Sequence, residues 1–198
     1  MARPSRSDSA PAPTPEGTDA IARVWELTFT GQIQTAIETA GAALDSLPLA
    51  AAQRAELLDL RAENSITRGQ TTAAEADAQA LDQLARQHRR DVAVQAWALR
   101  RHAVMLGRAG SADVSLAVAR QALKAAGRSG HTVLQALCLL VVAGALQRTG
   151  GDLDECIAMA QQAVQQLQVL GQATLALRAQ HAVCLLYTSD AADERSSV

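Results

Sequence analysis

Aromatic residues are nearly absent from this sequence: its 198 residues include two Trp, one Tyr and one Phe, or 2% of the chain. Hydrophobic residues nevertheless make up 48%, and most of them are Ala, Leu and Val. Ala and Leu favour helices, whereas aromatic and β-branched residues favour strands. The composition therefore predicts an all-α protein whose helices pack closely through small side chains.

A strong net charge and a long apolar run are missing as well. The formal charge is −2, so no overall field attracts the chain to nucleic acid or to anionic lipid. The longest apolar run, residues 136–146, is too short to span a bilayer. Residues 1–17 hold charge, Ser and Pro without the apolar core of a secretory signal, and they predict a disordered leader. We therefore expect a cytoplasmic protein with no membrane or nucleic-acid partner.

The motifs of enzymes and metal sites are also missing. The three cysteines, Cys138, Cys156 and Cys184, form no CxxC pair and are expected to be reduced thiols in the core. The histidines lack metal-ligand spacing, and there is no GxSxG elbow or phosphate-binding loop. The acidic stretch GDLDE, residues 151–155, is interpreted as a helix start capped by Asp152 and not as a cation site. We therefore predict no enzymatic activity, no cofactor and no metal.

What the sequence does contain is a regular helical pattern with short breaks. From Thr18 onward apolar residues recur at helical spacing, and breaks such as TFTGQ, TRGQT and RTGGD carry the Gly typical of helix ends. About nine helices of roughly 13 to 19 residues fit between the breaks. Short loops place neighbouring helices antiparallel, so the predicted unit is a helical hairpin.

The hairpins resemble one another. Four turns align at a glycine, with spacings of 38, 41 and 41 residues: Gly31, Gly69, Gly110 and Gly151. Five residues after each glycine stands a small residue: Ala36, Ala74, Ser115 and Cys156. Small side chains at this place let the two helices of a hairpin approach closely. Recurrence of this kind predicts an α-solenoid of antiparallel hairpins.

These units resemble the tetratricopeptide repeat family, whose turn has a GDYDEA-like sequence. GDLDECI, which begins at Gly151, is the best match, and GQIQTAI, which begins at Gly31, is the next. The resemblance covers residues 18 to about 183. The period of about 40 residues exceeds the family's usual length of about 34, so the long-helix variants found in bacterial regulators are the nearer likeness. An irregular solenoid outside that family is the competing interpretation.

The resemblance implies that the first helix of each hairpin lines a concave groove that takes peptides or partner helices. The groove positions carried over by it are Glu56, Asp59, Glu63, Trp97, Arg100, Val104, Arg108, Val141 and Arg148. Trp97 is the foremost candidate anchor because Trp and Arg dominate interface hot spots. The alternative is that Trp97 belongs to the core. The most basic stretch, RQHRRD at residues 86–91 followed by Arg100, Arg101 and His102, is interpreted as a solvated turn.

The C-terminal residues break the repeat pattern. LRAQHAV, residues 177–183, begins a fifth unit, but CLLYTSDAADE, residues 184–194, holds the only Tyr and no glycine stop. A DNA sequence that encodes this peptide resembles the adapter of transposon-based sequencing libraries. We therefore expect residues 184–198 to be a translated adapter and the domain, residues 18–183, to be truncated in its fifth repeat. The competing interpretation is a genuine C-terminal tail.

The predicted function is non-enzymatic binding of a protein or peptide, in the N-terminal regulatory part of a longer bacterial signalling protein. The role in signalling rests on the resemblance of the fold alone. Two alternatives stay open. The chain is either the N-terminal fragment of an enzyme, such as a nucleotide cyclase, whose catalytic domain is missing, or a small-molecule sensor that uses the groove as its pocket.

Overall fold

All regular secondary structure in the described part of the chain is helical. The computed structural model describes residues 12–196, with side chains up to Tyr187. This part forms nine α-helices and no strand: α1 (Pro15–Phe29), α2 (Ile33–Ser46), α3 (Ala51–Thr67), α4 (Thr71–Gln87), α5 (Val92–Arg108), α6 (Ala112–Ser129), α7 (Thr132–Arg148), α8 (Leu153–Val169) and α9 (Ala173–Ser196). The predicted all-α fold class is confirmed. Among these helices, none is long and apolar enough to cross a bilayer.

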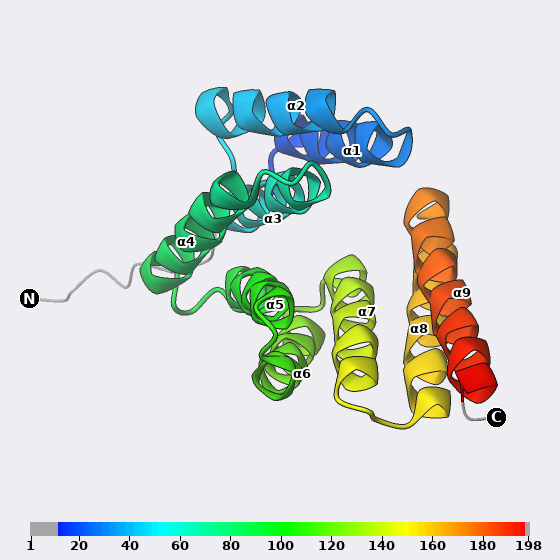
Figure 1. Ribbon diagram of the computed structural model, residues 1–198. Coiled ribbons are helices and arrows are strands. Elements are labelled where there is room, and N and C mark those ends of the chain that lie inside the picture. The colour runs from blue at the N-terminus through cyan, green and yellow to red at the C-terminus, as the bar shows by residue number, and fades with distance from the viewer. Residues whose placement is uncertain (1–11, 197–198) are drawn as a thin grey trace, which may run out of the picture.

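Consecutive helices pack against each other, and the helix pairs follow a curved path (Figure 1). The odd-numbered helices also contact one another in succession, α1 with α3, α3 with α5 and α5 with α7. They therefore form an inner layer, and the even-numbered helices lie outside it. At the end of the path α9 packs on α8, and its first residues come back to α1. The predicted α-solenoid thus curves far enough for its first and last helices to meet.

Glycines in the left-handed conformation end most of the helices. Six glycines have φ between 68° and 81°: Gly31, Gly69, Gly110, Gly130, Gly150 and Gly171. After α3, for example, Gly69 turns the chain so that the N–H of Gln70 donates to the carbonyl of Ser65 at 2.8 Å. Side chains other than Gly rarely adopt this backbone conformation, so these glycines decide where the helices stop.

The fourth turn carries one residue more than the sequence alignment assumed. The left-handed residue there is Gly150, and Gly151 follows it, donating its N–H to the carbonyl of Leu146 at 2.9 Å. A Cβ atom at Gly151 would collide with the Leu146 side chain, so the extra residue must itself be small. The helices nevertheless stay in register. The four small residues of the repeat are fully buried: Ala36, Ala74, Ser115 and Cys156.

The structure bears on both ends of the predicted domain. α1 begins at Pro15, three residues before the expected start at Thr18, because Thr14 caps the helix and accepts a hydrogen bond from the N–H of Gly17 at 3.2 Å. Residues 1–11 of the predicted leader lie outside the described residues. At the other end, α9 continues past Val183 to Ser196. The adapter origin of the last residues stays a prediction.

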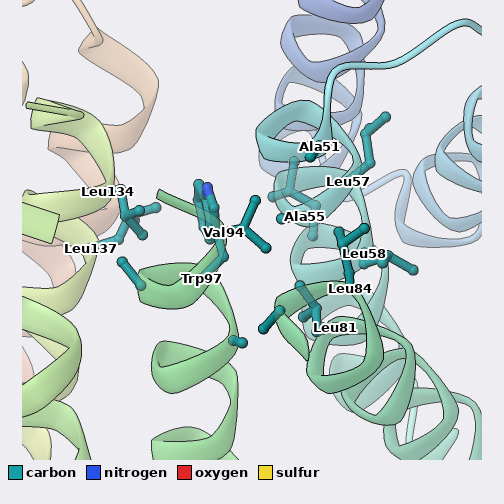
Figure 2. Close-up of a cluster of buried hydrophobic side chains, with 14 of the residues drawn as sticks. Ala51, Ala55, Leu57, Leu58, Leu81, Leu84, Val94, Trp97, Leu134 and Leu137 are labelled. Carbon is teal, nitrogen blue, oxygen red and sulfur yellow. The ribbon is translucent and has the colours of Figure 1, made fainter. Parts of the chain in front are cut away.

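Trp97 belongs to the core. Its side chain has no exposed surface, and Figure 2 shows it pointing from α5 toward Leu134 and Leu137 of α7. Figure 2 also shows Ala55 and Leu58 of α3 and Leu81 of α4 in the same cluster. The expectation that Trp97 anchors a partner in the groove is therefore wrong, because a side chain without exposed surface offers none to a partner.

Candidate functional site

The inner helices surround a cavity of about 540 Å³, which we call the central cavity. Its apolar wall consists of Ile66 from α3, Val104 from α5, Leu137, Leu140 and Val141 from α7, and Leu185 from α9. Its charged and titratable side chains are Glu63, Arg100, Arg108, Arg148, Arg178 and His181. A volume of this size and a mostly apolar wall with a few charged groups are typical of ligand-binding cavities.

Six of the nine residues predicted for the groove line the central cavity: Glu63, Arg100, Val104, Arg108, Val141 and Arg148. They come from α3, α5 and α7, all of them first helices of a hairpin. The other three are not in the lining. Trp97 is in the core, and Glu56 and Asp59 are buried polar residues of α3. The repeat pattern identified the correct helix faces, but it did not distinguish side chains at the cavity from those one layer deeper.

A buried ion-pair network lies behind the cavity wall. Asp59 pairs with both Arg100 and Arg101, and the Nε of Arg101 donates to it at 3.0 Å. The Nη2 of Arg101 donates to the Asp59 backbone carbonyl at 2.8 Å. Arg101 is fully buried and Arg100 is 6% exposed. The interpretation of the basic stretch as a solvated turn is therefore wrong for these two arginines, which are buried and paired with Asp59.

Glu63 connects this network to the last helix. It pairs with Arg101 at 3.2 Å and with Arg178 of α9 at 2.6 Å. Burial by itself would raise the pKa of Glu63, but Arg101, Arg100 and Arg178 outweigh it and lower the pKa to about 2. Glu63 is thus ionised at neutral pH, and its bond to a residue 115 positions away holds α9 against α3 across the cavity.

Two smaller cavities adjoin the central one. One, of about 320 Å³, shares Glu63, Arg178 and His181 with it and extends toward α1, where Trp25 and Phe29 form its wall. The other, of about 170 Å³, shares residues of α7 and α9 with the central cavity. The three cavities thus share lining residues and adjoin one another.

Arg108 and Arg148 differ from the arginines of the buried network. Both are exposed and both are the last residues of their helices, α5 and α7. Neither makes an ion pair or a hydrogen bond through its side chain within the part of the chain that the structure describes. The Arg148 guanidinium lies against the backbone of α5 at Gly107, where an added Cβ atom would be 2.7 Å from its Nη2. The absent side chain of Gly107 thus makes room for this charge at the cavity.

Arg178 and His181 are cavity residues that the sequence analysis missed. A signal for them was present, because LRAQHAV at residues 177–183 resembles LRRHAV at residues 99–104 with one residue inserted, so that Arg178 and His181 follow the order of Arg100 and His102. This resemblance predicted a fifth unit but did not predict that Arg178 and His181 would line the cavity. That its arginine would meet Glu63 depends on the curvature of the whole solenoid, which no single repeat contains.

Several of the described residues bear on the predictions about metal ligands, helix caps and thiols. No group of three or more His, Cys, Asp or Glu among them is placed to hold a metal ion. Asp152 caps α8 as predicted, accepting the N–H of Glu155 at 3.0 Å. Cys138 is buried, and burial raises the pKa of its thiol to about 12, so it is no nucleophile at neutral pH. Cys184 is exposed and not in the core as expected.

Comparisons with models of protein families, with curated proteins and with solved structures gave no match to this chain. Its function is therefore inferred from the cavity itself.

Glu56 is a buried acid beside the ion-pair network. It accepts a hydrogen bond from the Trp25 indole at 3.4 Å, and His131 Nε2 lies 3.7 Å from its other oxygen. Burial raises the pKa of Glu56 to about 7, with a further rise from Asp59, against the hydrogen bond of Trp25 and the charge of Arg100. At neutral pH this carboxyl is therefore divided between its protonated and ionised forms.

We predict that Glu56→Gln makes the protein less sensitive to pH between about 4.5 and 7. The unfolded chain releases the Glu56 proton near its ordinary pKa of 4.5, whereas the folded chain holds it up to about 7. The stability that this carboxyl contributes is therefore complete below pH 4.5 and is lost as the pH rises to 7, by about 3 kcal/mol in all. Urea unfolding of both proteins at four pH values from 4.5 to 7.5 measures the difference.

Comparing the two proteins isolates Glu56 from the other titrating groups. Burial lowers the pKa of His131, which opposes the Glu56 effect below pH 6.5, but His131 is present in both proteins. Parallel pH profiles for the wild type and the Gln variant would show that Glu56 keeps an ordinary pKa in the folded state.

Proposed function

We propose that this chain is a non-enzymatic binding module whose central cavity holds a peptide segment of a partner protein. The observation that carries the proposal is the gathering of arginine and apolar side chains, from four helices far apart in the sequence, around one cavity on the inner side of the solenoid. Arginine is among the residues that supply most of the binding energy at protein interfaces. The two adjoining cavities extend the space beyond the central cavity, which suits a chain segment.

The tetratricopeptide-like character of the repeat and a regulatory role in a longer cytoplasmic protein are part of the same proposal. The hairpin unit of about 40 residues and the buried small residue in each hairpin support the first. A small-molecule sensor is the second candidate, because about 540 Å³ is also within the range of small-ligand sites.

A random peptide library displayed on phage tests the binding function. The wild-type chain is expected to enrich defined sequences. Val141→Trp, which fills the central cavity from α7, is expected to abolish the enrichment. Val114→Trp is the matched control, because Val114 is 53% exposed on the outer helix α6. It introduces the same bulk away from the cavity and is expected to enrich the same peptides as the wild type.

The outcomes separate the candidates. Enrichment that survives Val141→Trp would place the binding surface elsewhere on the molecule. If no peptide is enriched while a small metabolite binds to the wild type and not to Val141→Trp, the sensor function replaces the peptide-binding function.

A further inference from the structure

We infer that the segment held in the central cavity is acidic: Asp or Glu side chains pair with Arg108 and Arg148, and apolar side chains beside them pack on the wall formed by α7. This inference rests on the proposed peptide-binding function and specifies the chemistry of its ligand. It is argued from the charge, the unpaired donors and the shape of the cavity.

The first observation is an excess of positive charge. Four guanidinium groups and a single carboxylate, that of Glu63, line the central cavity. Glu63 is already engaged by Arg101 and Arg178, so it does not neutralise the remaining arginines. The chain as a whole carries a net charge of −2, which makes this concentration of cations a local feature. Complementary charge then favours an anionic ligand.

The second observation is an unpaired donor in the cavity wall. Arg100 lines the cavity and is 6% exposed, yet its Nε–H has no hydrogen-bond acceptor among the described residues, although its Nη1 pairs with Asp59. A buried donor without an acceptor is costly, and an anionic ligand in the cavity would lower that cost by bringing negative charge near Arg100. All three arginines line the central cavity, and they differ in exposure: Arg100 is buried in its wall, whereas Arg108 and Arg148 are exposed.

The third observation is the arrangement of polar and apolar groups. Arg108 and Arg148 end α5 and α7, which contact each other, whereas Leu137 and Leu140 lie nearer the middle of α7. Carboxylates and apolar side chains of one peptide would thus bind at successive places along the cavity. No Phe, Tyr or Trp among the described residues lines the central cavity itself to stack a base, which favours a peptide over single-stranded nucleic acid there.

Helix ends offer a competing explanation for two of these arginines. A cation in the last turn is favourable for its own sake, because it opposes the helix dipole. On that explanation Arg108 and Arg148 stabilise α5 and α7 and have no ligand. If the arginines bind a ligand, substituting them weakens the binding of an acidic peptide. If they only oppose the helix dipole, substituting them lowers the stability and leaves peptide binding unchanged.

The test uses fluorescein-labelled peptides of twelve residues and fluorescence anisotropy with the full chain. One peptide repeats Leu-Glu-Glu, a second has Gln for every Glu, and a third has Lys. We expect the Glu peptide to bind at least about tenfold more tightly than the Gln peptide, and the Lys peptide not to bind, since hydrogen bonds between guanidinium and carboxylate are among the strongest in proteins. Arg108→Gln and Arg148→Gln are each expected to weaken the Glu peptide about tenfold and to leave the Gln peptide unchanged.

Arg120→Gln is the matched control, because Arg120 is an exposed arginine of the outer helix α6 with no side-chain partner in the described structure. It is expected to bind the Glu peptide as the wild type does. Urea unfolding of each variant verifies that the fold is kept and measures any contribution of the helix ends.

Each outcome has one meaning. Equal binding of the Glu and Gln peptides, or variants that lose stability without losing affinity, would overturn the acidic ligand and leave peptide binding intact. Glutarate that binds as tightly as the Glu peptide and displaces it would show that a small dicarboxylate is sufficient, and would overturn the peptide as the ligand. If the library yields no peptide and the Glu peptide does not bind either, the proposed function itself fails.

Discussion

Asp59→Ala is expected to destabilise the protein by about 3–5 kcal/mol, a large part of the stability of an ordinary domain. The substitution removes the only carboxylate that pairs with Arg100 in the described structure and one of the two that pair with Arg101. Arg100, with almost no exposed surface, is then left without a paired carboxylate among the described residues, and the fully buried Arg101 keeps only Glu63. Urea unfolding followed by circular dichroism measures the loss.

A surface pair provides the control for Asp59→Ala. Arg23 and Glu26 form an ion pair on α1 whose side chains are 55% and 63% exposed. Removing Glu26 is expected to change the stability by less than about 0.5 kcal/mol, because water solvates both charges in either state. If Asp59→Ala cost no more than Glu26→Ala, the two arginines would have to reach solvent, and the buried network would be absent in solution.

Trp97→Ala is expected to cost about 3–5 kcal/mol, since it leaves an unfilled volume among α3, α4, α5 and α7. The ring also contacts two polar groups of the site. His131 meets it edge-on with centroids 6.0 Å apart, and the Arg100 guanidinium lies 5.9 Å from its centroid. Thermal and urea unfolding followed by circular dichroism measures the loss, because the other Trp complicates a fluorescence signal.

Trp97→Phe distinguishes the packing of the ring from its polar atom. The indole nitrogen of Trp97 has no hydrogen-bond acceptor among the described residues, so the Phe variant loses volume but no hydrogen bond. A cost of about 1 kcal/mol is expected. A Trp97→Ala protein that keeps its stability but loses peptide binding would restore Trp97 as a partner-binding residue and contradict its place in the core.

The helices were predictable from the sequence because local signals fix their ends. Gly69 illustrates this, since its left-handed conformation stops α3 at a place that the glycine alone indicates. The inner faces of the hairpins were predictable because the repeat places equivalent residues on equivalent faces. Val104 and Val141 follow this logic, and both line the central cavity.

Whether an individual side chain on these faces is buried or exposed could not be predicted from the repeat. Arg100 and Arg101 are adjacent in a basic stretch, and sequence alone gives no reason to bury either of them. Their burial depends on Asp59 of the preceding hairpin, 41 and 42 residues earlier. The contact of Glu63 with Arg178 is more distant still, because it requires the accumulated curvature of the three hairpins from α3 to α8.

If residues 184–198 derive from an adapter, only one residue of the central cavity lining is affected. Of the residues that line the central cavity, only Leu185 lies in the stretch that resembles an adapter. The arginines on which the proposed function depends all precede it. Sequencing the source locus through the codon for Val183 would decide the origin of the last residues.

The most direct test of the binding cavity is a nuclear magnetic resonance titration of the arginine side-chain Nε–H signals with the unlabelled Leu-Glu-Glu peptide. The signals of Arg100, Arg108 and Arg148 are expected to shift together and to saturate, whereas that of Arg120 on the outer face stays in place. Shifts confined to the outer helices α2, α4, α6 and α8, with these three arginines unaffected, would contradict a binding site inside the solenoid.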